Sequence, residues 1–168
     1  MQGHAVLQQF NHTIGHFIKA LDNYTLEQIC RQPQPGRWSL GQMYRHIIDD
    51  TAWFVQQMKA CLATTHHINE SMHEDAQAMF AANAFPDILI EGPATNTYIP
   101  QPPSKDELLQ ELLTIQNEVN SLDFSAPSGK TLHPGLLYFN ATEWLQFAEM
   151  HIRHHFRQKQ RIDNYLFK

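Results

Sequence analysis

Cysteine is scarce in this sequence, and its scarcity excludes two ways of building a small protein. The 168 residues include two cysteines, Cys30 and Cys61, and neither belongs to a Cys-x-x-Cys pair. A disulfide framework needs several cysteines, and a thiolate zinc site needs them in closely spaced pairs. We therefore expect neither architecture here.

Long apolar runs and dense basic runs are missing as well. No apolar stretch approaches the roughly 18 residues that a membrane-spanning helix requires, and the first residues lack the charged-then-apolar order of a secretion signal. The net charge is −5 with histidine neutral, which disfavours nucleic acid or an anionic membrane as the partner. The sequence predicts a cytoplasmic protein that acts on a small molecule.

Several catalytic signatures are absent too. The sequence contains no His-Glu-x-x-His motif, no Gly-x-Ser-x-Gly elbow, no P-loop and no dinucleotide-binding glycine pattern. These absences remove support for a zinc protease of that type, a serine hydrolase of the elbow type and a nucleotide-binding enzyme.

Hydrophobic periodicity predicts an all-α protein that forms a single domain over residues 1–168. Four long amphipathic helices are expected, over residues 4–22, from Ser39 to about 62, from Ser104 to about 122 and from Asn140 to about 165. Each of these three polar residues is followed three positions later by Gln or Glu, which is the spacing of a capping box.

A long connection separates the second and third of these helices. Residues 63–103 are interrupted by prolines and show little periodicity, with room for one short helix within 71–84. In a compact domain so long a connection is usually a crossover or a functional segment. The pattern predicts a four-helix bundle with a long crossover between helices two and three.

Histidine, in contrast, is abundant, with 11 residues. His151 and His155 are one helical turn apart and fall, with Gln158, on the apolar face that Trp144 and Phe147 define. A buried polar group without a partner costs about 1–3 kcal/mol, so three of them in one core layer require a common explanation. A shared metal ion is one explanation, and hydrogen bonds to one another or to buried water are the other.

The second predicted helix supplies candidates for a third ligand. His46 borders its apolar stripe, and Asp50 lies one turn further on. Three histidines with an open coordination position are typical of catalytic metal sites. Asp50 is the candidate catalytic residue; it could bind the ion, orient the His46 ring or lie solvated on the helix surface.

The other basic side chains are expected outside this site. His154 falls at the edge of the apolar stripe, where it could support the site or pack against another helix. His133 lies in a turn before the last helix and could line the mouth of a pocket. Arg153 and Arg157 are expected to be solvated charges on the outer side of that helix. Five further histidines are expected at the surface: His12, His16, His66, His67 and His73.

Two blocks of this sequence resemble the DinB-like superfamily. The first, W-S followed by six residues and H, runs from Trp38 to His46 and is similar to the start of helix two in that superfamily. The second joins Glu143 and its neighbouring tryptophan to the H-x-x-H-H-x-x-Q run that begins at His151, and it is similar to the last helix of one branch. The middle of the chain, residues 63–103, shows no such likeness.

The resemblance implies a four-helix bundle that binds a divalent metal, commonly nickel, zinc or iron, through three histidines. Carried over onto this sequence, the ligands are His46, His151 and His155. It further implies an enzyme in which metal-activated water or a low-molecular-weight thiol is the nucleophile, hence a hydrolase or a thiol-dependent S-transferase. The alternative is a non-catalytic bundle that binds a metal or another small ligand. A bundle of this size could also form a homodimer.

Overall fold

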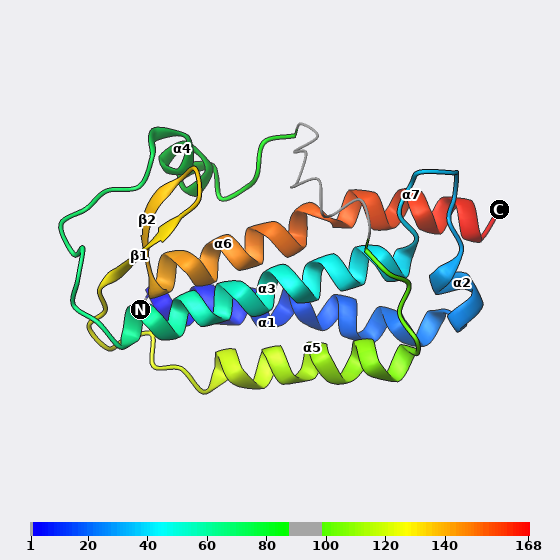
Figure 1. The fold of residues 1–168 in the computed structure, drawn as a ribbon, viewed down its shortest axis with the longest axis horizontal. Helices are drawn as coiled ribbons and strands as arrows, with labels where there is room; N and C mark the ends of the chain where they lie inside the picture. The colour runs from blue at the N-terminus through cyan, green and yellow to red at the C-terminus, as the bar shows by residue number, and fades with distance from the viewer. Residues whose placement is uncertain (1, 88–98) are drawn as a thin grey trace.

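Four long helical segments dominate the computed structural model, which describes residues 2–87 and 99–168 (Figure 1). Three of them are α1 (Gln2–Ala20), α3 (Leu40–Leu62) and α5 (Lys105–Asn120), and the fourth consists of α6 (Ala141–His154) followed by α7 (Phe156–Leu166). The shorter elements are the 3₁₀ turn η1 (Leu21–Asn23), α2 (Leu26–Cys30), α4 (Glu74–Ala82), and a hairpin of β1 (Lys130–His133) and β2 (Leu137–Asn140). The predicted all-α four-helix bundle is confirmed.

The arrangement of the helices explains the long crossover. α1 and α3 each pack against both α5 and α6, which closes the bundle. In Figure 1, α3 and α5 run in the same direction along the bundle, so the chain between them must return over its whole length. Within the two described ranges, no helix is both long enough and apolar enough to cross a bilayer.

Local capping signals begin the helices at the expected residues. The Ser39 hydroxyl accepts a hydrogen bond from the backbone N–H of Gln42, whose side chain accepts one from the N–H of Ser39. The start of α6 has the same reciprocal pair. Ser104 likewise accepts from the N–H of Glu107, but the Glu107 carboxylate lies 3.7 Å from Arg45 instead of returning to the cap.

Aromatic and aliphatic side chains from all four long segments fill the core. Fully buried members with large side chains include Phe10, Phe17, Tyr44, Leu40, Met43, Met58, Phe139 and Trp144. All of these residues except Phe139, which comes from β2, occupy the apolar stripes that the periodicity predicted, so most of the core follows from the helix pattern.

Gly41, in the first turn of α3, stands where the packing leaves no room for a side chain. A Cβ atom there would lie 2.6 Å from ring carbons of Pro102 and 2.8 Å from Cγ2 of Ile29. Gly41→Ala should therefore lower the free energy of unfolding by about 1–3 kcal/mol, because a rigid proline ring cannot move aside. Gly15, inside α1, has open space at the same position, so Gly15→Ala should raise it by about 0.5–1 kcal/mol through better helix propensity. Urea denaturation of both variants measures the contrast, and equal effects would contradict this account.

The fourth long segment differs from the single helix that was expected over residues 140–165. His155 separates α6 from α7, with ψ near −6°. Its backbone N–H donates to the carbonyl of Ile152, three residues back, so the helix tightens into a 3₁₀-like turn at this point. Helical periodicity did not reveal the interruption, because the apolar stripe continues through it.

The hairpin before α6 was not predicted. Lys130 pairs with Asn140 and His133 pairs with Leu137 in an antiparallel register, and Gly135 at φ +90° makes the reversal. Each strand has four residues, which is too short for an alternating pattern to stand out. The hairpin covers one end of the core, where the Trp144 indole N–H donates to the Thr131 hydroxyl at 2.8 Å.

Candidate metal centre

Three histidines meet at one point inside the bundle. His46 projects from α3, His151 from α6, and His155 from the junction between α6 and α7. Nε2 of His151 lies 3.2 Å from Nε2 of His46 and 3.3 Å from Nε2 of His155. The three candidate ligand atoms all lie within 4.8 Å of one another. The structure therefore brings together the three residues that the sequence singled out.

Burial keeps these imidazoles uncharged near neutral pH. His46 and His151 are each 8% exposed, and His155 is partly buried. Burial lowers the pKa of His46, although Asp50 opposes the shift. Burial, together with the neighbouring histidines, lowers the pKa of His151 well below its ordinary value and that of His155 to about 4. Neutral imidazoles have a free lone pair, which metal binding requires.

The hydrogen bond behind His155 selects one tautomer. Nδ1 of His155 lies 2.9 Å from Oε1 of Gln158, one turn further along α7. An amide oxygen can only accept, so Nδ1 donates and Nε2 presents its lone pair to the other two rings. A metal-binding histidine usually has such a partner on its second nitrogen. Gln158, which the sequence placed on the apolar face, thus orients His155.

Asp50 lies beside the histidines and not on an open helix surface. Its Oδ2 is 3.6 Å from Nε2 of His46 and 3.6 Å from Nε2 of His151, and its side chain is 38% exposed. Burial raises the pKa of Asp50 and Asp49 adds to the increase, while His46 opposes it. A carboxylate with a raised pKa is a stronger proton acceptor than an ordinary aspartate. At this distance Asp50 could receive a proton from a molecule at the centre or contribute an oxygen ligand.

Aromatic rings surround the three histidines. The Trp38 ring lies 5.0 Å from His46 between centroids. Phe54 and Phe85 lie 5.6 Å and 5.9 Å from His151. Such rings exclude water and strengthen electrostatic interactions in the centre. Phe85 was missed because it lies in the connection after α4, where no helical pattern relates it to α6.

The structure places the remaining histidines elsewhere. His154 lies outside the cluster, with its ring 5.5 Å from Phe85. His133, which was expected in a turn, is the last residue of β1, and its ring stacks on Trp144 at 5.5 Å between ring centroids. His12, His16, His66 and His67 are exposed, as expected, and His73 forms the N-cap of α4.

Arg153 differs from the solvated charge that was expected. Its guanidinium donates to both oxygens of Glu149, at 2.9 Å each, and to the carbonyl oxygen of Asn83 at 2.7 Å. Glu149 is only 1% exposed, so Arg153 neutralises a buried carboxylate. Arg157 is exposed, and its partner is Asp87. The sequence placed Arg153 on the outer side of the last helix. It could not show this role, because Asn83, which follows α4, is distant in sequence.

The donor set at the centre suits a divalent transition metal. Imidazole nitrogen is a good ligand for zinc, iron and nickel. In the protein alone, the Nε2 atom of His151 has two neighbouring ring nitrogens within hydrogen-bond distance, at 3.2 Å and 3.3 Å. One cation could instead accept the lone pairs of all three nitrogens. His46, His151 and His155 are thus the residues that could hold an ion, with Asp50 beside it.

Fold and site together define a helical bundle with a buried histidine cluster between α3 and the α6–α7 junction. A family model described as the DinB superfamily matches residues 9–158, a range that contains every residue of the cluster. The chain belongs to the DinB superfamily. No curated protein and no solved structure matched it.

Proposed function

We propose that this protein is a divalent-metal enzyme with His46, His151 and His155 as the metal ligands and Asp50 as the catalytic proton acceptor. The convergence of three uncharged imidazoles within 4.8 Å, inside a largely apolar core, carries this proposal. Nickel, zinc or iron would each suit the three nitrogen ligands. When bound, such an ion supplies a Lewis acid that lowers the pKa of water or of a thiol and stabilises developing negative charge.

The nucleophile is proposed to come from outside the protein. Burial raises the pKa of both cysteine thiols, and a thiol with a raised pKa is a poor nucleophile at neutral pH. Cys61 is fully buried and contacts the carbonyl oxygen of Phe139, while Cys30 contacts that of Pro102. The resemblance to DinB-like proteins supplies two candidates, water and a low-molecular-weight thiol, so the proposed reaction is a hydrolysis or a thiol-dependent S-transfer on a small molecule.

The side chains around the centre have complementary tasks in this proposal. Gln158 fixes the His155 tautomer through the 2.9 Å contact, and Trp38 packs on His46. Asp50 takes the proton that the incoming water or thiol releases, because its raised pKa and its position 3.6 Å from two of the histidines suit a general base.

Replacing Asp50 by asparagine tests the catalytic part of the proposal. We expect Asp50→Asn to retain the metal content of the wild type, near one equivalent, while turnover falls roughly a hundredfold or more, which is the usual contribution of a general base. The measurement is elemental analysis of untagged protein, followed by hydrolase and thiol-transfer assays with the metal found. Asp49→Asn is the matched control, because Asp49 is exposed and pairs with Arg45. Asp49 is a smaller cause of the raised pKa of Asp50 than burial is, so turnover should change far less than in Asp50→Asn.

Each alternative gives a different result in the same experiment. Loss of metal from Asp50→Asn would make Asp50 a ligand instead of a base. Wild-type protein that holds metal but turns over no substrate in either assay would favour the non-catalytic, metal- or ligand-binding bundle. Wild-type protein that takes up no nickel, zinc or iron would overturn the proposed function.

A further inference from the structure

His151 occupies the middle of the histidine cluster, yet its ring lacks the hydrogen bond that orients His155. Nδ1 of His151 is buried and, within residues 2–87 and 99–168, has no hydrogen-bond partner. A metal-binding imidazole needs a fixed ring plane, and a partner on the second nitrogen normally provides it. Ring packing can perform this task instead: the ring centroids of Phe54 and Phe85 lie 5.6 Å and 5.9 Å from that of His151.

Phe54 is part of the rigid helix α3, but Phe85 belongs to the segment that follows α4. This segment, residues 83–87, begins with Asn83 in a left-handed conformation, at φ +51°. The ring of Phe85 lies 5.0 Å from Phe147, 5.9 Å from His151 and 5.5 Å from His154. A phenylalanine on an irregular segment keeps such a position only if the segment itself is held against α6.

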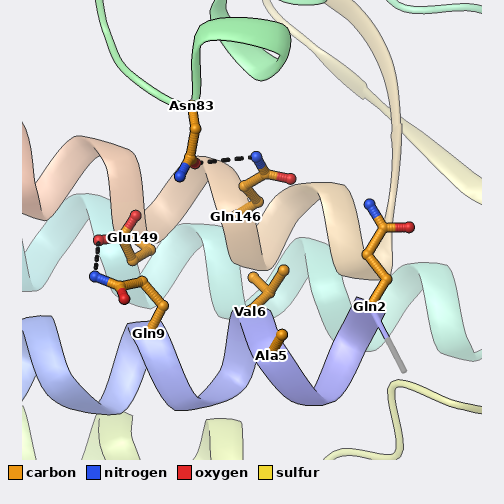
Figure 2. A pocket seen from close by; sticks show the side chains of 7 residues that line it. All are labelled: Gln2, Ala5, Val6, Gln9, Asn83, Gln146 and Glu149. Atoms are coloured by element: carbon orange, nitrogen blue, oxygen red, sulfur yellow. Dashed lines mark hydrogen bonds between the residues drawn. The ribbon is translucent and has the colours of Figure 1, made fainter.

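Two side chains of α6 hold Asn83 in place. Gln146 donates to the side-chain oxygen of Asn83 at 3.1 Å, a contact that Figure 2 shows above the ribbon of α6. Arg153 donates to the backbone carbonyl of Asn83 at 2.7 Å. Asn83, Gln146 and Glu149 also line a cavity of about 280 Å³ between α1 and α6 (Figure 2).

Arg153 is itself firmly positioned. Its guanidinium donates two 2.9 Å hydrogen bonds to the Glu149 carboxylate, and the hydroxyl of Thr13 in α1 donates to that carboxylate at 2.7 Å. At the other end of the segment, Asp87 pairs with Arg157 of α7. The segment is thus tied to the bundle at both ends, with Phe85 between the two attachments.

We propose that Phe85 is a positioning residue for His151, and that Arg153 and Gln146 hold Phe85 there through Asn83. The inference rests on the proposed function, because it assigns Phe85 to a ligand of the proposed centre. It adds a role for a segment distant in sequence from every ligand, and it explains why a buried ion pair on α6 reaches across to the end of α4.

Replacing Phe85 by alanine should change the histidine cluster without removing a ligand. We expect Co²⁺ to bind Phe85→Ala roughly tenfold more weakly than the wild type, the lower end of the effect seen when a ligand loses its orienting partner. The visible absorption of bound Co²⁺ should change as well, because the geometry of the His151 ligand relaxes. Phe85→Leu, which keeps an apolar side chain on the ring, should recover most of the affinity.

Phe80 provides the matched control. It comes from the same region, is also partly buried, and packs on Phe139 at 5.3 Å instead of on His151. Phe80→Ala should lower the thermal stability as Phe85→Ala does, but leave the Co²⁺ affinity and spectrum of the wild type. Equal effects of the two alanine variants on Co²⁺ binding would overturn the proposal, because they would reduce it to general destabilisation.

Nuclear magnetic resonance of the histidine rings in metal-free protein separates this inference from the proposed function. The His151 ring resonances should shift and broaden in Phe85→Ala and, to a smaller extent, in Arg153→Lys, which keeps a positive charge beside Glu149 but loses the fork that also reaches Asn83. Unchanged His151 resonances in Phe85→Ala would overturn the inference. Failure of the wild type to bind Co²⁺ would instead contradict the proposed function, and the ring resonances would still decide the role of Phe85.

Discussion

Replacing His151 by alanine should reduce the affinity for a divalent metal by more than about a hundredfold. His151 is the central residue of the cluster, with its Nε2 at 3.2 Å and 3.3 Å from the other two ligand atoms, so its removal leaves only two of the three imidazole ligands. Loss of a partner that merely orients a ligand already costs about 10–100-fold in affinity, and loss of the ligand itself should exceed that. Elemental analysis of untagged protein and titration of metal-free protein with zinc, nickel and iron(II) provide the measurement.

His154→Ala is the control for this prediction. It removes a histidine from the same run of α6, but one whose ring lies outside the cluster and packs on Phe85. Metal affinity close to that of the wild type is expected. If His151→Ala kept the full affinity, or if His154→Ala lost it, the metal site would have to be assigned to other residues.

Metal-free protein should lose stability steeply as the pH falls from about 6.5 towards 4. Burial lowers the pKa of His155 from 6.5 to about 4, and those of His46 and His151 shift in the same direction. Above pH 6.5 these side chains are neutral in both the folded and the unfolded chain. Below it, the unfolded chain binds protons that the folded chain does not, so the free energy of unfolding falls. His155 alone should account for a loss of about 2 kcal/mol by pH 5.

Urea denaturation in the presence of a chelator, between pH 7.5 and 5, measures this loss while most carboxylates remain ionised. Asp50 has the opposite effect: its raised pKa means that the folded chain binds a proton before the unfolded chain does, which increases the free energy of unfolding as the pH falls. The variant His155→Gln should show a shallower decline, because one of the titrating groups is gone. A free energy of unfolding that stayed constant from pH 7 to pH 5 would contradict the buried, neutral state of the cluster. Added metal should raise stability at pH 7 by mass action.

Much of the fold could be predicted from local patterns. Capping signals at Ser39 and Asn140 place the beginnings of two bundle helices, and prolines in residues 63–103 indicate the long connection. The break at His155 could not be predicted, because the apolar stripe continues through it. The hairpin before α6 could not be predicted either, because its strands are too short to show an alternating pattern. The hairpin depends on contacts with other elements, such as the bond between Thr131 and Trp144.

By itself, the sequence determined which residue types share a helix face. The spacing of His151 and His155 therefore pointed to a cluster, and His46 joined it as a candidate because it borders the apolar stripe of another helix. Only the tertiary structure decided that the three Nε2 atoms meet and that Asp50 reaches two of them. It alone also decided that Phe85 packs near His151 and that Arg153 bonds to Asn83. The physical reason is that helical periodicity relates only residues a few positions apart in the sequence. These contacts join residues separated by up to about a hundred positions, and only the packing of the helices brings such residues together.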